Sequence, residues 1–367
     1  MLKNIDRKYL LFGGIIIGVI VIFVIILLVI SATKGGKVGY KDIETRMYRA
    51  AVQYYEKHEK DLPKNDGATI SISIDKLVKS GNLTSLEESL DEGVSCKGEV
   101  TVTNNNQSYI YLPYLDCGKA YKTEKLVNKI VDSDVLNEVE EGLYEVEDGY
   151  VYKGENVNNY LEFAGKNWRI IKINEDGTIR VILAERLEQM AWDDRYNVDK
   201  KFNAGINSYD VSRIKEKLQE IYEDPEMFND TERSMIVTQN LCISHRSENS
   251  EINDGSIECA NTFDGQQLGL LQLNEYLIPS LDDNCTKPSD RSCINYNYLA
   301  TFDRSYWTIT GDSETSYMVY NIDGYAELKR ANSVSGVNPV INLTKNLIYD
   351  SGKGTIDEPY KIKKYTK

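Results

Sequence analysis

An uncharged apolar run near the N-terminus constrains this chain more than any other feature. Residues 10–32 read LLFGGIIIGVIVIFVIILLVISA and contain no charged side chain. A helix rises about 1.5 Å per residue, so this run covers the hydrocarbon core of a bilayer, which is roughly 30 Å thick. We therefore expect residues 10–32 to form one transmembrane helix in contact with membrane lipid.

A cleaved signal peptide is the alternative interpretation of the same run. Its apolar region would be shorter, about 7–15 residues, and a small-residue cleavage site would follow it. Ser31-Ala32-Thr33 is a poor version of such a site. We expect the segment to be retained, so that residues 1–33 form a cytoplasmic tail and a membrane anchor.

The cysteines orient this helix, because the basic residues on its two sides are balanced. All six cysteines follow the helix in close sequential pairs, as in oxidised extracellular domains: Cys96, Cys117, Cys242, Cys259, Cys285 and Cys293. The prediction is a single-pass plasma-membrane protein with a cytoplasmic N-terminus and an extracellular C-terminal bulk.

Composition and length further narrow the possible partners and the possible kinds of exterior structure. The net charge is −14, and nucleic acid is excluded as a partner because phosphate binding needs a basic surface. The whole chain has 41% hydrophobic residues and 26 tyrosines, so we expect the exterior part, which makes up most of it, to be folded and not a disordered stalk. More than 300 residues outside the membrane suffice for two α+β domains.

The first exterior domain is predicted over residues 40–120. An amphipathic helix is indicated by apolar residues spaced by four, three and four positions: Ile43, Met47, Ala50 and Tyr54. A second, short helix follows with Ser73 as its N-cap. Residues 98–103 and 108–112 then form a hairpin, and Cys96 and Cys117 flank it almost symmetrically, which predicts a disulfide between them.

Residues 121–148 are predicted to link this domain to a second one over residues 149–367. Successive strands are expected at 150–152, 160–163, 168–173 and 178–183, followed by a helix from Val211 that Ser208 or Asp210 caps. Later strands are expected around 306–309, 317–320 and 337–343. Among the three possible connectivities of the last four cysteines, we favour the local pairs Cys242 with Cys259 and Cys285 with Cys293.

Four separated motifs of this second domain resemble a known family. They are Tyr160-Leu-Glu-Phe-Ala-Gly-Lys-Asn-Trp-Arg-Ile-Ile, Ser305-Tyr-Trp-Thr-Ile, Gly336-Val-Asn-Pro-Val-Ile-Asn-Leu and Gly352-Lys-Gly-Thr-Ile-Asp-Glu-Pro-Tyr. In this order they look like an uncharacterised domain family of Firmicutes surface proteins. That family resembles the C-type-lectin-like fold of formylglycine-generating enzymes, so the resemblance implies a C-type-lectin-like domain over about 149–367.

The region before residue 120 resembles, more weakly, a type IV pilin or pseudopilin. The shared features are the apolar helix, the amphipathic helix and the cysteine-closed hairpin. Prepilins carry a Gly-Phe-Thr-Leu-Ile-Glu type of processing site before the apolar segment, whereas Asp6-Arg7-Lys8-Tyr9-Leu10 stands here. This departure argues against processing by a prepilin peptidase and assembly into a filament.

The chain offers few groups for catalysis. His58 lies among charged residues at a solvated helix end, and His245 follows Cys242 at a zinc-like spacing but without an evident fourth ligand. Six cysteines in three pairs leave no thiolate nucleophile, and the paired active-site cysteines of formylglycine-generating enzymes have no match here. We therefore expect no enzyme activity, no metal and no cofactor.

The tryptophans are the candidate ligand platforms, because an indole offers a flat apolar face and one donor. Trp168 and Trp307 are expected to fill the core, although Trp307 stays a candidate for ligand contact. Trp192 lies in a polar stretch with Asp193 and Asp194, and we predict a surface contact there.

These features favour a membrane-anchored bacterial surface protein with a non-catalytic ectodomain that binds an extracellular protein or glycan. The alternative is a pilin-like or pseudopilin-like structural component of the envelope, in which N-terminal helices associate through Gly13, Gly14 and Gly18. An extracellular enzyme is the third hypothesis, and a pocket with two convergent carboxylates would distinguish it.

Overall fold

The computed structural model describes residues 39–105, 108–133, 140–302 and 304–365. The predicted membrane helix over residues 10–32 lies outside these ranges. Within them, none of the helices combines the length and apolar character that a membrane crossing needs. The described chain is a mixed α+β structure, as the sequence predicts.

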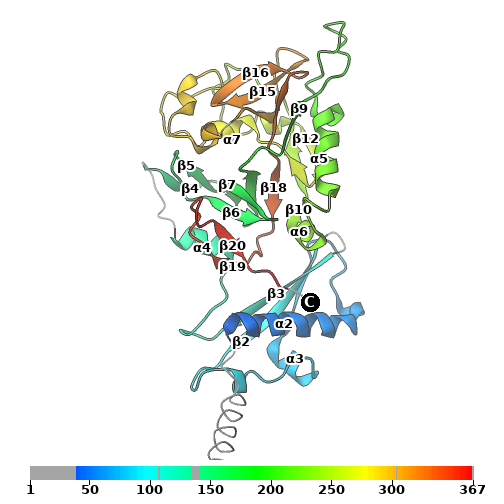
Figure 1. Cartoon of the computed structure of the whole chain (residues 1–367), viewed down its shortest axis with the longest axis vertical. Helices are drawn as coiled ribbons and strands as arrows, with labels where there is room; N and C mark the ends of the chain where they lie inside the picture. The colour runs from blue at the N-terminus through cyan, green and yellow to red at the C-terminus, as the bar shows by residue number, and fades with distance from the viewer. Residues whose placement is uncertain (1–38, 106–107, 134–139, 303, 366–367) are drawn as a thin grey trace, which may run out of the picture.

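The smaller, N-terminal domain is a helix packed on a three-stranded antiparallel sheet (Figure 1). The strand order is β1-β2-β3, and the elements are α2 (Tyr40–Glu56), β1 (Thr69–Ser73), α3 (Ile74–Lys79), β2 (Lys97–Asn105) and β3 (Ser108–Asp116). The expected apolar face of α2 is buried against this sheet. Ser73 caps α3 by accepting from the backbone N–H of Lys76, which confirms that predicted cap.

The predicted hairpin and its disulfide are present in this domain. β2 and β3 pair from Lys97 opposite Asp116 to Asn105 opposite Ser108. Cys96 and Cys117 stand immediately outside the first of these pairs and form a disulfide. The pairing register therefore places the two sulfurs together, as the symmetrical spacing predicts.

The larger domain is built on a ten-stranded mixed sheet. Its main path is β10-β18-β8-β7-β6-β20-β19, while β13 pairs with β18, β5 with β7, and β4 with β5. The strands are β4 (Gly142–Val146), β5 (Gly149–Lys153), β6 (Tyr160–Phe163), β7 (Lys166–Asn174), β8 (Ile179–Leu183), β10 (Ile236–Val237), β13 (Leu268–Gly269), β18 (Val340–Leu343), β19 (Tyr349–Ser351) and β20 (Tyr360–Ile362).

Two further sheets and four helices complete this domain, with α5 running alongside β9 and β12 in Figure 1. The five-stranded sheet has the order β16-β15-β14-β17-β9 and comprises β9 (Glu188–Ala191), β14 (Tyr306–Gly311), β15 (Met318–Asp323), β16 (Tyr325–Arg330) and β17 (Val334–Val337). A two-stranded sheet pairs β11 (Gln239–Cys242) with β12 (Thr262–Gln266). The helices are α4 (Leu126–Ser133), α5 (Arg213–Glu223), α6 (Asp230–Met235) and α7 (Leu273–Leu277).

Both remaining cysteine pairs are local. Cys242 is bonded to Cys259 and Cys285 to Cys293. This confirms the favoured connectivity among the three that the sequence allows. Each bond closes a loop-rich segment that has few regular backbone hydrogen bonds of its own.

Two predicted elements differ from the observed ones. The helix expected from Val211 begins at Arg213, because Tyr209–Val211 forms a short 3₁₀ turn and Ser212 is the N-cap. The run 337–343 is not one strand. It divides at Asn338-Pro339 into β17 and β18, which belong to different sheets, since proline lacks the N–H that a continuous ladder needs.

The predicted linker over residues 121–148 contains elements of the larger domain. Leu126 and Ile130 of α4 are fully buried in its core. β4 pairs along its whole length with β5. The segment is therefore packed chain over much of its described length and not a bare connection.

A buried polar cluster joins the two domains. Glu44, in the middle of α2, is fully buried and accepts hydrogen bonds from Tyr121 Oη at 2.6 Å, from the Thr123 hydroxyl and from Lys363 Nζ at 2.6 Å. Tyr365 adds a longer hydrogen bond at 3.3 Å. Because Lys363 and Tyr365 follow the last strand of the larger domain, its C-terminal tail is fixed to the helix of the smaller one.

Breaking this ion pair on one side should destabilise the protein strongly. Lys363→Met leaves the Glu44 carboxylate buried without its cation, which costs about 3–5 kcal/mol in comparable sites. The double variant Glu44→Gln, Lys363→Met should lose less than the single one. Lys41→Met is the matched control, because its ion pair with Asp350 is exposed and worth at most about 1 kcal/mol. Urea unfolding followed by circular dichroism measures all three, and equal losses for Lys41→Met and Lys363→Met would contradict this account.

Candidate functional site

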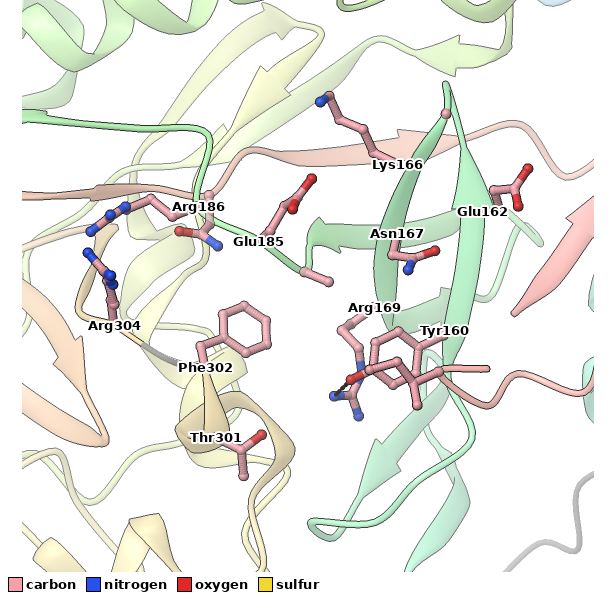
Figure 2. Close-up of a pocket in the computed structure, with 14 residues that line it drawn as sticks. Tyr160, Glu162, Lys166, Asn167, Arg169, Glu185, Arg186, Thr301, Phe302 and Arg304 are labelled. Atoms are coloured by element: carbon pink, nitrogen blue, oxygen red, sulfur yellow. Dashed lines mark hydrogen bonds between the residues drawn. The ribbon is translucent and has the colours of Figure 1, made fainter. Parts of the chain in front are cut away.

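An open cavity of about 890 Å³ lies where the ten-stranded and five-stranded sheets of the larger domain meet. Its walls come from the β6–β7 hairpin, the chain after β8, the segment before β14, the β17–β18 junction and the β19–β20 loop (Figure 2). Volumes of roughly 300–1,000 Å³ are usual for small-molecule sites. It is the candidate site because of the charges that line it.

The β6–β7 hairpin places a tyrosine and an arginine face to face in this cavity. Ala164 and Gly165 both have positive φ, +51° and +70°, as a two-residue type I′ turn requires. The resulting register sets Tyr160 directly opposite Arg169. Side chains alternate along each strand, so Trp168 enters the core while Arg169 faces the cavity.

Arg169 is a buried cation. Its residue surface is only 4% exposed, and its guanidinium lies over the Tyr160 ring at 4.1 Å and the Tyr298 ring at 4.7 Å from the centroids. Nε donates to Asn159 Oδ1 and Nη1 donates to Tyr160 Oη at 3.0 Å. Burial lowers the pKa of this guanidinium, yet arginine remains charged at neutral pH. No carboxylate of the described residues forms an ion pair with it.

Three more cations line the same cavity: Lys166, Arg186 and Arg304. As for Arg169, the described part of the chain supplies none of them with an ion pair. The described lining residues also include two carboxylates, but Glu162 is paired with Lys361 at 3.2 Å, which leaves Glu185. In a chain of net charge −14, this is a local excess of positive charge.

Two buried polar atoms at the cavity have no hydrogen-bond partner among the described residues. One is Nη1 of Arg186 and the other is Oδ1 of Asn338. Asn338 is only 2% exposed, and its Nδ2 already donates to the carbonyl of Leu183 at 3.0 Å. Buried polar groups are rarely left unsatisfied, so both atoms offer hydrogen bonds to a bound molecule.

A second cavity of about 600 Å³ lies between β7 and α7 and has a different character. Arg180 there is bound by both oxygens of Glu275, at 3.1 Å for the Nη2 contact. Lys172 is paired with Asp148. Arg180 and Lys172 are thus neutralised by the protein itself, and Lys153 is the lining cation that the described residues leave without an ion pair. The first cavity has four such cations, so it is the better anion site.

The tryptophan candidates are not part of either cavity. Trp192 and Trp307 are fully buried, and their indole N–H groups donate to the carbonyls of Thr308 at 3.1 Å and Met190 at 2.9 Å. The surface contact predicted for Trp192 is therefore wrong, because the ring lies in the hydrophobic core and meets the ring of Tyr209 edge-on. Trp307 and Trp168 fill the core as expected.

The two aspartates after Trp192 have separate environments. Asp193 is fully buried and organises the loop, because its carboxylate accepts from Arg195 Nε at 2.8 Å, Ile206 N at 2.8 Å and Arg213 N at 3.2 Å. Asp194 is exposed and only loosely paired with Arg213 at 3.4 Å. Asp193 thus has a structural role, and neither aspartate lines the cation-rich cavity.

Sequence reasoning passed over the residues that do line it. Arg169 belongs to one of the family-like motifs, but the motif alone does not mark it as a binding residue. The available signal was a single arginine inside the apolar strand Trp168-Arg169-Ile170-Ile171. Arg186, Arg304 and Asn338 lie in separate loops, and only the folded chain brings them together.

Histidines, cysteines and acids do not form a second type of site in the described ranges. His58 stacks on Tyr54, and His245 lies near the carbonyl of Asn207 at 3.2 Å. No group of three or more potential metal-binding side chains is found there. Comparisons with protein-family models, curated proteins and solved structures give no match to this chain.

The neighbouring aspartates provide a matched pair of substitutions. Asp193→Asn should lower the free energy of unfolding by about 1.5–3 kcal/mol, because charge-assisted hydrogen bonds to the loop are lost. Asp194→Asn should change it by less than about 0.5 kcal/mol, as for other exposed positions. Thermal and urea unfolding of both variants measures this, and equal effects would refute the structural role of Asp193.

Proposed function

We propose that this chain is a bacterial cell-surface protein whose larger domain binds an acidic ligand, without catalysis, in the cavity around Arg169. The resemblance of its motifs to C-type-lectin-like surface domains agrees with a binding role. The cation-lined cavity, and not the segment around Trp192, is the binding region.

Arg169 is the observation that carries this proposal. A buried guanidinium without a carboxylate is costly unless a counter-charge reaches it. Its aromatic and amide contacts hold the fork in place, but they supply no negative charge. Arginine binds carboxylate and phosphate groups through two parallel hydrogen bonds. An acidic group of a ligand therefore supplies the missing negative charge and also accepts hydrogen bonds from the guanidinium fork.

A binding role without chemistry is supported by the state of the reactive side chains. All six cysteines are in disulfides, so the oxidised chain has no thiolate nucleophile. Among the described residues that line the cavity, Glu162 is held by Lys361, which leaves Glu185 without a second free carboxylate for paired acid and base work.

Anion binding is tested with two sugars that differ only at one carbon. Galacturonate, which carries a carboxylate, should raise the midpoint of thermal unfolding of the full chain by about 2 °C or more at ten times its dissociation constant. Galactose should not. Arg169→Lys keeps the charge but loses the bidentate fork, so it should weaken galacturonate binding about tenfold in calorimetry.

Arg291→Gln is the control for this experiment. Arg291 is exposed and its guanidinium lies over the Tyr325 ring, outside the cavity, so its replacement removes a surface arginine without touching the site. Equal responses to galacturonate and galactose would refute anion recognition. Equal affinities of Arg169→Lys and Arg291→Gln for galacturonate would show that the anion binds elsewhere.

We further propose that residues 10–32 anchor this ectodomain at the outer face of the plasma membrane. The second candidate, an envelope component assembled through its N-terminal helix, is favoured by the pilin-like arrangement of α2 on a disulfide-closed three-stranded sheet. In both cases the larger domain is exposed to the exterior.

Protease treatment of intact cells should remove the ectodomain, because the proposed topology places it outside. Crosslinking in intact membranes should give monomers if the chain acts alone as a receptor. Full protection from protease would overturn the topology, whereas a ladder of crosslinked copies would favour the envelope component.

A further inference from the structure

We propose that the cavity is built for an oligosaccharide that carries at least two acidic groups separated by neutral hydroxyl groups. This inference rests on the proposed anion binding and specifies the ligand class. It follows from the order in which cations, neutral acceptors and a carboxylate are arranged around the cavity.

Two cationic regions stand apart on the cavity wall. In Figure 2, Arg186 and Arg304 lie on one side, and Arg169 of β7 lies on the other side beside Tyr160 of β6. Phe302 lies between these two regions in that view. The described residues give Arg186 and Arg304 neither an ion pair nor a hydrogen bond. A ligand with one acidic group satisfies only one region, so the second calls for another acidic group.

Asn338 adds a requirement for a hydrogen-bond donor on the ligand. Its Oδ1 is buried and unpartnered, whereas its Nδ2 is already used on the carbonyl of Leu183. An amide oxygen accepts and does not donate. Carboxylate and fully ionised phosphate groups cannot satisfy it, but a sugar hydroxyl can.

Glu185 distinguishes an acidic saccharide from a continuous polyanion. It is exposed in the same cavity, and in Figure 2 its carboxylate lies between Lys166 and the Arg186 side. A polyanion whose charged groups follow one another without intervening hydroxyl groups would place negative charge against it, which is unfavourable. A ligand with hydroxyl groups at that point donates hydrogen bonds to Glu185 instead.

Shape and apolar surface agree with such a ligand. Phe302 presents a partly exposed ring to the cavity, and an apolar ring face can pack on the C–H face of a sugar ring. The volume of about 890 Å³ is near the upper end for small-molecule sites, which suits more than one sugar ring. The cavity is also open to solvent, so the ends of a longer chain can extend out of it.

Titration calorimetry of the full-length chain in detergent tests this with four probes: trigalacturonate, galacturonate, maltotriose and tripolyphosphate. Trigalacturonate should bind at least about tenfold more tightly than galacturonate, since it reaches both cationic regions. Maltotriose, which is neutral, should bind far more weakly than trigalacturonate. Tripolyphosphate should bind at least about tenfold more weakly than trigalacturonate.

Two exposed variants separate the parts of the argument without disturbing the fold. Arg304→Gln should lower the affinity for trigalacturonate about tenfold and leave that for galacturonate within about twofold. Glu185→Gln should raise the affinity for tripolyphosphate several-fold while trigalacturonate changes little. Arg291→Gln is again the control and should change neither.

The outcomes distinguish this inference from the function on which it rests. If galacturonate and trigalacturonate bind equally well, or if Arg304→Gln has no effect on the trimer, the two-region arrangement is wrong although anion binding stands. If tripolyphosphate binds as tightly as trigalacturonate, the saccharide class is wrong. If no acidic probe binds, the proposed function itself fails.

Discussion

The buried ion pair between Glu44 and Lys363 is the interaction on which the arrangement of the two domains depends. It joins the middle of the first described helix to the end of the described chain, 319 positions later. A buried carboxylate is stable only when its oxygens are fully occupied, and here Tyr121, Thr123, Lys363 and Tyr365 occupy them. The directional nature of these hydrogen bonds fixes how the C-terminal tail approaches α2.

Apolar contacts extend the same junction. Ile110 and Leu112 on the hairpin of the smaller domain pack with Ile348 of the larger one, and Tyr48 of α2 stacks on Tyr365. Burial raises the pKa of Tyr365, with Glu44 as a further cause, so its hydroxyl stays a neutral donor over the physiological range. The two domains thus share a small core of their own, and a movement of one must be accompanied by the other or must break that core.

Buried arginines of the larger domain are found in two states, paired with a glutamate or without a carboxylate partner among the described residues. This contrast identifies the candidate site. Arg246 and Glu258 are fully buried and paired at 2.9 Å, and Arg180 is bound by both oxygens of Glu275. Arg169 is buried to a similar degree but has only aromatic and amide neighbours among the described residues. Since the acidic chain has carboxylates in excess, the missing partner is a feature of this one place and not a shortage of acids.

Local patterns in the sequence determined much of the fold. Apolar spacing placed α2, the Ser73 cap placed α3, and strand-like runs between turn residues placed β2, β3 and β6 to β8, because these signals act between near neighbours in the chain. The close pairs of cysteines likewise predicted all three disulfides. Long-range packing decided the rest. Trp192 is buried by core contacts that include the ring of Tyr209, and the cavity brings together side chains from five separate segments. Such neighbours are set by tertiary contacts, for which a single sequence carries no periodic signal.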